Sequence, residues 1–195
     1  MTVWSIDRLR RMAAGLALAT LLVACVPESE HPLAAADPAK NDARLWGTWL
    51  STSEEGHMVA HVFATEKGTL QIVLAEHGVE GLGEIDTYEA HVTNLPSGDY
   101  LNVVVEEPEA GYLICNYQLE GTDTLSVRLL SNGALEEAVK TGTLPGTTKV
   151  EGGMTDVWIT ATSKQWQAFL LKPPADFFDG PISFKRVGPA YVEQQ

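Results

Sequence analysis

Histidine and glutamate side chains supply much of the metal-binding and catalytic chemistry of proteins, so their spacing is considered first. His57 and His61 form an H-x-x-x-H pair, which on a helix would place both imidazoles on one face, close enough for one metal ion. The surrounding segment HMVAHVFAT alternates in polarity as a β-strand does, and four residues of strand separate the two side chains by ~13 Å. We therefore predict two separate histidines on the surface or the barrel wall, and no metal site.

The other acidic and histidine clusters are equally poor candidates. Glu89 and His91 share a strand face at ~7 Å, but two ligands do not make a metal site. Glu106, Glu107 and Glu109 fall in one turn, whereas a glycosidase needs two carboxylates that face each other across a cleft. The sequence contains no G-x-S-x-G motif and suggests no Cys/His pair. We predict a protein that is not an enzyme and that uses no cofactor.

The sequence has two cysteines, Cys25 and Cys115, with different surroundings. Cys115 shares one face of a predicted strand with Leu113, Tyr117 and Leu119, which lie at every second position. No basic residue flanks it to lower its pKa, so we predict a buried, unreactive thiol.

The first 24 residues have the pattern of a signal peptide. Three arginines precede an uncharged stretch of twelve residues, 12–23, which is shorter than the ~20 that a membrane-spanning helix needs. Leu22-Val23-Ala24-Cys25 resembles the lipobox of bacterial lipoproteins. The resemblance implies diacylglycerol on the Cys25 thiol, removal of residues 1–24 and acylation of the new amino group. The alternative is a secreted protein cut at Ala34-Ala35-Ala36, a site too far beyond the apolar stretch.

The residue after Cys25 bears on localisation. In lipoproteins of this type an aspartate there tends to retain the protein in the inner membrane, and this chain has Val26. The resemblance therefore favours an outer-membrane lipoprotein whose domain faces the periplasm. We expect a membrane partner through the lipid on Cys25.

Charge and composition limit the other partners. The net charge is −13, and the mature chain would hold 10 basic and 25 acidic residues, so nucleic-acid phosphates and anionic lipid head groups should repel it. Residues 25–44 are predicted to be the lipidated cysteine and a flexible tether. This segment is polar, has three prolines and no apolar periodicity, and would reach ~25 Å if flexible.

Residues 45–195 are predicted to form a single, mainly β domain. Short runs of alternating polarity, separated by Gly, Pro, Asp and Ser, predict seven consecutive strands: Leu45–Ser51, His57–Thr65, Thr69–Glu76, Glu84–Leu95, Tyr100–Glu106, Tyr112–Glu120 and Thr124–Leu130. Two short helices near the C-terminus (Gly133–Thr141 and Ser163–Leu171), two further strands (Val157–Thr162 and Ile182–Val187) and a mobile loop (Gly142–Gly153) complete the prediction. Hairpin-length connections favour an antiparallel meander, and eight to nine strands can close into a barrel.

Gly47-Thr48-Trp49 in the first strand resembles the G-x-W motif of lipocalins and related calycin barrels. In that family the glycine permits a tight bend, the tryptophan plugs the closed end, and a late basic residue packs over the tryptophan. Arg186 in the last strand matches that position. The family's second motif and its disulfides are absent, and another antiparallel barrel or a sandwich remains the alternative.

The aromatic residues suggest where a ligand could bind. Several lie in the first strand or in the last forty residues, which fits either core packing or an aromatic-lined pocket near the barrel mouth. Under the second interpretation the ligand-binding candidates are Trp49, Trp158, Phe177 and Phe178. We expect a non-catalytic, lipid-anchored envelope protein whose barrel binds a small apolar ligand. The alternative is a structural or protein-interaction module with a filled barrel and an acidic surface for a basic partner protein.

Overall fold

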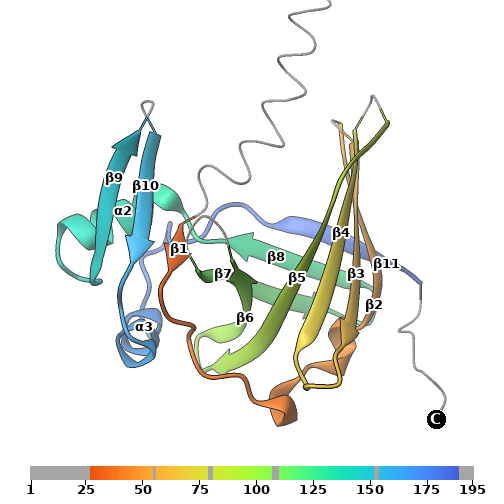
Figure 1. Cartoon of the computed structure of the whole chain (residues 1–195), viewed down its shortest axis with the longest axis horizontal. Helices are drawn as coiled ribbons and strands as arrows, with labels where there is room; N and C mark the ends of the chain where they lie inside the picture. Colours follow the sequence, from red (N-terminus) through yellow and green to blue (C-terminus); the bar gives the residue numbers. More distant parts are fainter. Residues whose placement is uncertain (1–26, 55, 79–80, 107–109, 152–153, 189–195) are drawn as a thin grey trace, which may run out of the picture.

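The computed structural model describes residues 27–54, 56–78, 81–106, 110–151 and 154–188, and its main feature is a β-barrel (Figure 1). Within these ranges, eight strands form the barrel: β2 (Gly47–Ser53), β3 (Gly56–Ala64), β4 (Leu70–Gly78), β5 (Gly81–Leu95), β6 (Gly98–Val105), β7 (Gly111–Glu120), β8 (Thr124–Leu129) and β11 (Ile182–Gly188). Seven of them follow the predicted runs with shifts of a few residues at their ends, and β11 follows the predicted run 182–187.

Each barrel strand pairs antiparallel with the next, and β11 closes the ring by pairing with both β8 and β2. In Figure 1, β2 to β5 run steeply, while β7, β8 and β11 cross them at a large angle. The predicted closed, antiparallel barrel is therefore confirmed, with eight strands.

The alternation of the sequence decides which face of each strand is inside. On β3, Ala60 and Val62 are buried inside the barrel, whereas His57 and His61 are exposed outside. The same period-two pattern on the other strands builds the barrel core, whose buried members are Leu45, Trp49, Ala60, Val62, Leu70, Ala90, Val92, Leu101, Val103, Cys115, Tyr117, Leu125 and Phe184.

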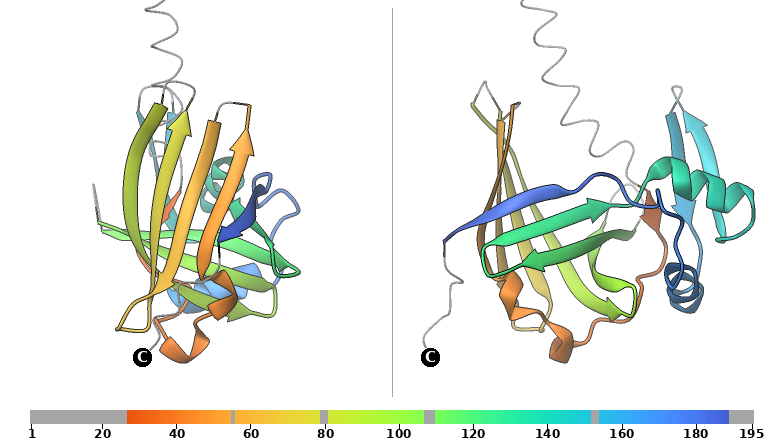
Figure 2. Two further views of the ribbon diagram at one scale, coloured as in Figure 1. Left: turned by 90° about the vertical axis from the view of Figure 1, so that its right-hand side faces the viewer. Right: turned by 180° about the vertical axis from the view of Figure 1, so that it is seen from behind.

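A second layer packs on the outside of the barrel. It contains β1 (Glu28–Ser29), α2 (Asn132–Lys140), β9 (Gly146–Glu151), β10 (Met154–Ile159) and α3 (Ser163–Leu170), and Figures 1 and 2 show it beside β6 and β7. Both α-helices lie where the sequence predicts them. The Thr162–Gln165 capping box of α3 is present, and Lys140 of α2 pairs with Glu136 at 2.7 Å.

The prediction of a mobile loop over Gly142–Gly153 is wrong for much of that range. Residues 146–151 form β9, which pairs antiparallel with β10 from Gly146 opposite Ile159 to Glu151 opposite Met154. The glycine content led to the wrong prediction, but Gly146 is needed for packing. A Cβ atom there would lie 2.8 Å from the Trp158 carbonyl oxygen and 2.8 Å from a Val139 methyl group.

The prediction of a flexible tether is also wrong for residues 27–44, the described part of it. Glu28 and Ser29 form β1, and Leu33 is fully buried. Asp37 and Asp42 cap two short 3-10 helices, η1 (Pro38–Lys40) and η2 (Ala43–Leu45). The N-terminal segment (residues 27–45) therefore belongs to the folded domain.

Candidate functional site

One end of the barrel is closed by the residues of the G-x-W motif. This closed end is where β3, β5 and β7 finish and where β2 begins. Gly47 has a φ of 132°, a conformation that favours glycine, and the bend lets η2 turn into β2. Trp49 is fully buried, and its Nε1 donates a hydrogen bond to the Leu45 carbonyl oxygen at 2.7 Å. The tryptophan thus fills the barrel beneath η2.

Arg186 completes the closed end. Its guanidinium carbon lies 4.0 Å from the centroid of the Trp49 ring, a cation–π contact. The guanidinium also donates hydrogen bonds to the carbonyl oxygens of Arg44, Trp46 and Thr122, the last at 2.8 Å. Arg186 therefore joins η2 and β2 to the connection between β7 and β8. The placement that the lipocalin resemblance implied for Trp49 and Arg186 is confirmed.

Asp42 adds a polar clamp at the same end. Its carboxylate accepts hydrogen bonds from the Arg44 guanidinium at 2.7 and 2.8 Å and from the Tyr117 hydroxyl at 3.1 Å. Partial burial of the Asp42 carboxyl acts to raise its pKa, but the hydrogen bonds and charge of Arg44 and the hydrogen bond from Tyr117 together lower it. Burial beside Asp42 raises the pKa of Tyr117.

The opposite end of the barrel is more exposed. This open end is where β2, β4 and β6 finish and where β3, β5 and β7 begin. Along β4 the inward side chains change from fully buried Leu70 to half-buried Ile72 and Leu74. On β7, Leu113 near the open end is half-buried and Tyr117 is buried, but Leu119 next to the closed end is half-buried again.

Strands β3, β5, β8 and β11 show the same gradient as β4, and the half-buried inward apolar side chains lie toward the open end. They are Met58, Ile72, Leu74, Tyr88, Leu113, Val127, Leu129 and Ile182. The register adds two half-buried carboxylates to the same inward face, since Glu76 lies opposite Met58 and Asp86 lies opposite Leu74. The open end therefore presents mostly apolar surface with acidic groups among it, and the protein itself covers this surface only in part.

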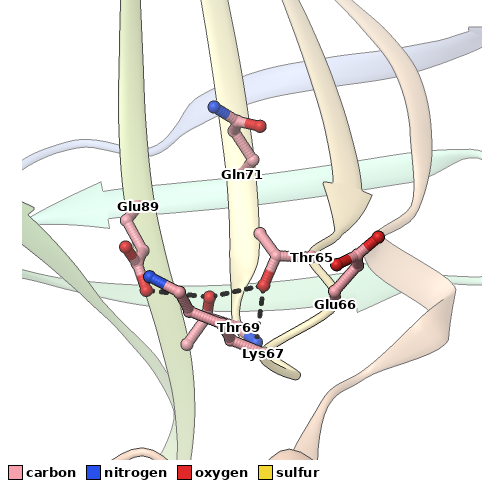
Figure 3. A pocket seen from close by; sticks show the side chains of 6 residues that line it. All are labelled: Thr65, Glu66, Lys67, Thr69, Gln71 and Glu89. Atoms are coloured by element: carbon pink, nitrogen blue, oxygen red, sulfur yellow. Dashed lines mark hydrogen bonds between the residues drawn. The ribbon is translucent and has the colours of Figure 1, made fainter.

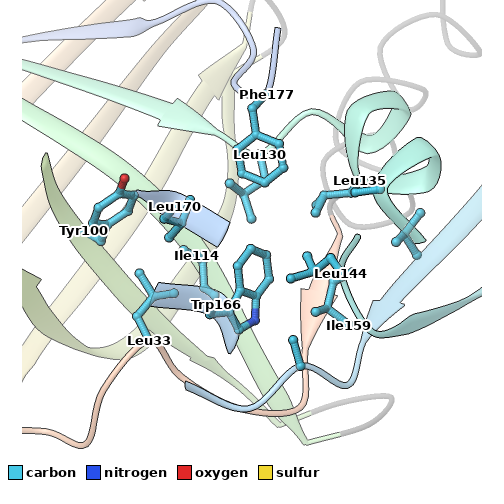
Figure 4. Packing of buried hydrophobic residues seen from close by; sticks show 13 residues of the cluster. Leu33, Tyr100, Ile114, Leu130, Leu135, Leu144, Ile159, Trp166, Leu170 and Phe177 are labelled. Atoms are coloured by element: carbon cyan, nitrogen blue, oxygen red, sulfur yellow. The ribbon is translucent and has the colours of Figure 1, made fainter. Parts of the chain in front are cut away.

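The four predicted ligand-binding residues do not meet in one pocket, so that part of the prediction is wrong. Trp49 lies in the barrel core, whereas Phe177 is fully buried in a separate cluster outside the barrel. Figure 4 shows this second core, in which Trp166, Leu170 and Phe177 pack between the helices and the outer wall. Its buried members are Leu33, Tyr100, Ile114, Leu130, Leu135, Ala138, Leu144, Val157, Ile159, Ala161, Trp166, Leu170 and Phe177.

Trp158 and Phe178 are half-buried and also lie outside the barrel. The ring of Trp158 covers the start of β7, where a Cβ on Gly111 would come within 2.9 Å of it. The Phe178 ring lies 5.3 Å from that of Phe177 and 6.4 Å from that of Tyr100. These contacts attach the second layer to the barrel, and they give both residues a structural role.

Two of the surface depressions have partly polar linings. The first, of about 280 Å³, is beside the connection between β3 and β4 (Figure 3), where Thr69 donates a hydrogen bond to Glu89 at 2.9 Å. The second, of about 250 Å³, lies where β5 separates from β6, and its lining includes the inward side chain Tyr88 together with Val105 and Glu106. Glu107 and Glu109 of the predicted acidic turn lie outside the described residues.

The histidines have structural partners on the outer wall. His57 and His61 are on strand β3, as predicted, and their Nδ1 atoms lie 3.1 Å from the Thr52 hydroxyl and 3.0 Å from the Thr48 hydroxyl. The register places His77 directly opposite His57, a pairing that the spacing within one strand could not indicate. Within the described ranges, no three His, Cys, Asp or Glu side chains lie close enough together to hold a metal ion.

Cys115 is buried in the barrel core, as predicted. Burial raises the pKa of its thiol to about 12, so the thiol stays protonated and unreactive. Cys25, the predicted lipidation site, lies outside the described residues. None of the helices in the described part of the chain is long and apolar enough to cross a bilayer.

No protein-family model, curated protein or solved structure matches this chain. The relation to lipocalins therefore rests on Gly47, Trp49 and Arg186 and on the barrel itself, and membership of that family stays a prediction.

Proposed function

We propose that this chain is a non-catalytic, lipid-anchored protein of the bacterial cell envelope whose barrel binds a small apolar ligand at its open end. The gradient of burial inside the barrel is the observation that carries the proposal. Trp49, Leu45 and Arg186 fill one end, while the inward apolar side chains at the other end remain half-exposed. An apolar molecule that covered them would gain ~25 cal/mol for each Å² of apolar surface removed from water.

The proposed anchor is diacylglycerol on Cys25, in the outer membrane and facing the periplasm. Its support is the signal-peptide pattern and the Leu22-Val23-Ala24-Cys25 sequence. The test is the mass of the N-terminal peptide of the protein purified from membranes. A peptide that begins at Cys25 and carries a lipid mass is expected, whereas an unmodified Cys25 or a cut elsewhere contradicts the anchor.

The ligand is tested separately on residues 26–195 produced without the lipid. Native mass spectra are recorded before and after incubation with oleate as the probe, and the bound material is extracted with organic solvent. A stoichiometric apolar adduct is expected. A bare protein mass under both conditions contradicts the ligand-binding proposal.

One observation favours the alternative, a protein-interaction module. Leu50, Val59, Ala75 and Ile85 lie opposite one another in successive strands and form an apolar row across the outer wall. Ile85 in this row is 58% exposed. A photo-crosslinker at Ile85 should give a defined product with a partner protein in the envelope, and one at exposed Gln118 on β7 should not. Equal products at both sites would contradict a partner on this row.

A further inference from the structure

The first strand of the domain lies beside the open end of the barrel. Ser29 of β1 pairs with Tyr112, the second residue of β7, and β7 begins at the open end. β1 also runs parallel to β10, with Glu28 opposite Trp158 and Ser29 opposite Ile159. Because the strands are parallel, the chain before Glu28 enters β1 from the side of the β9–β10 connection.

The N-terminal segment is firmly attached after that point. The Ser29 hydroxyl accepts a hydrogen bond from Trp166 Nε1 at 2.8 Å, and the backbone N–H of Glu30 donates to the Ile159 carbonyl oxygen at 2.9 Å. The backbone N–H of Leu33 donates to the side-chain oxygen of fully buried Asn102 at 2.7 Å. Two residues lie between Cys25 and Glu28, so the three steps along the chain span at most ~10 Å. A lipid on Cys25 is therefore held close to β1.

Two parts of the molecule extend to the same side as the start of β1. Figures 1 and 2 show the β9–β10 hairpin on one flank and the upper ends of β3, β4 and β5 on the other, with β1 between them. Each part carries an exposed large apolar side chain. Val150 on β9 is 70% exposed, and Ile85, four residues after the start of β5 and on the outer wall, is 58% exposed. Such side chains favour contact with the interfacial region of a bilayer.

We propose that β1 holds the open end of the barrel against the bilayer into which the lipid on Cys25 inserts. The inference rests on the lipid anchor proposed above, and it adds an orientation and a partner, the membrane surface itself. Glu54, Asp86 and Glu106 lie near the open end, so the surface that fits is zwitterionic lipid, since anionic head groups would repel these carboxylates. The apolar ligand then passes between the bilayer and the barrel without crossing bulk water.

The experiment uses the full lipidated protein in phosphatidylcholine vesicles. A fluorophore is attached at Gly78→Cys, near the end of β4, or at Lys67→Cys, in the connection between β3 and β4 at the closed end. Gly78 is exposed and an added Cβ there meets no atom within 4 Å, so the label should not disturb the fold. Cys115 is buried and should remain unlabelled. Lipids spin-labelled on the head group then quench fluorophores near the membrane surface.

Loss of most of the emission is expected at Gly78→Cys, with little loss at Lys67→Cys. Equal quenching at the two positions, or stronger quenching at Lys67→Cys, overturns the inference. The mass of the Cys25 peptide is measured on the same sample, so a missing anchor is distinguished from a wrong orientation.

A second variant tests the role of β1. A Gly/Ser linker of about twelve residues between Val26 and Pro27 adds a reach of ~20 Å. The quenching at Gly78→Cys should then fall toward that at Lys67→Cys. If it does not change, β1 does not set the orientation and the inference is overturned.

Discussion

At the scale of single residues, Trp49 and Arg186 hold the closed end. Replacing Trp49 with Ala should lower the free energy of unfolding by ~3–5 kcal/mol, because a fully buried indole leaves a cavity. Arg186→Lys should cost roughly 1.5–3 kcal/mol, because an ammonium group cannot reach three carbonyl oxygens and stack on the indole at once. Urea unfolding followed by circular dichroism gives both values. Lys185→Arg, at the exposed neighbour of Arg186, is the control, and an equal loss there would contradict the assignment.

Asp42 gives the domain a pH dependence of known sign. Its pKa is lowered in the folded chain, so the unfolded chain binds the proton more tightly. The stabilisation is present above the unfolded pKa of about 3.8 and is lost as the pH falls through the lower folded pKa. Asp42→Asn should therefore lower stability at pH 7 and flatten its decline below pH ~4. Urea unfolding between pH 2 and 7 measures this. If Asp42→Asn loses stability below pH ~4 as steeply as the unchanged protein does, this role is contradicted.

At the scale of elements, the N-terminal segment determines how the second layer attaches to the barrel. Leu33→Ala should cost ~2–5 kcal/mol, since Leu33 is fully buried in the second core. Leu171→Ala, at a side chain that is 64% exposed, is the matched control and should change stability by less than ~0.5 kcal/mol. Equal melting temperatures of the two variants would show that the segment does not pack as described.

The elements that the sequence predicted correctly are those whose contacts follow a local period. The alternation Leu70, Ile72 and Leu74 is visible without any partner, and so is the capping box of Thr162 and Gln165. The N-terminal segment was missed because its contacts are distant in sequence: Leu33 bonds to Asn102, 69 residues away. Local composition there shows only polarity and proline, which indicates a tether.

The candidate site was predictable only in part, for a related reason. The G-x-W motif located Trp49, and a late basic residue located Arg186. Aromatic type alone could not tell an inward from an outward position, so Phe177 and Trp158 were assigned to a pocket that they do not line. From the sequence alone, the inward apolar residues of the open end, such as Leu74 and Leu113, cannot be distinguished from core residues. Only the closed barrel shows which half of its interior they occupy.

At the scale of the whole molecule, the barrel has one filled end and one partly exposed end, and the second layer lies outside the wall. The central claim is that the partly exposed end holds an apolar ligand. Leu74 and Val73 are neighbours on β4, both half-buried, with Leu74 facing into the barrel and Val73 facing out. Replacing either residue with Arg adds the same charge, inside the barrel at Leu74 and outside it at Val73.

The most direct measurement is the occupancy of the apolar adduct in native mass spectra of residues 26–195, compared for the unchanged domain, Leu74→Arg and Val73→Arg. The account predicts that Leu74→Arg loses the adduct, because a guanidinium paired with the Asp86 carboxylate opposite it would fill the open end with charged groups, while Val73→Arg keeps it. Circular dichroism checks that both variants are folded. An adduct that survives Leu74→Arg, or that Val73→Arg removes equally, would contradict binding inside the open end.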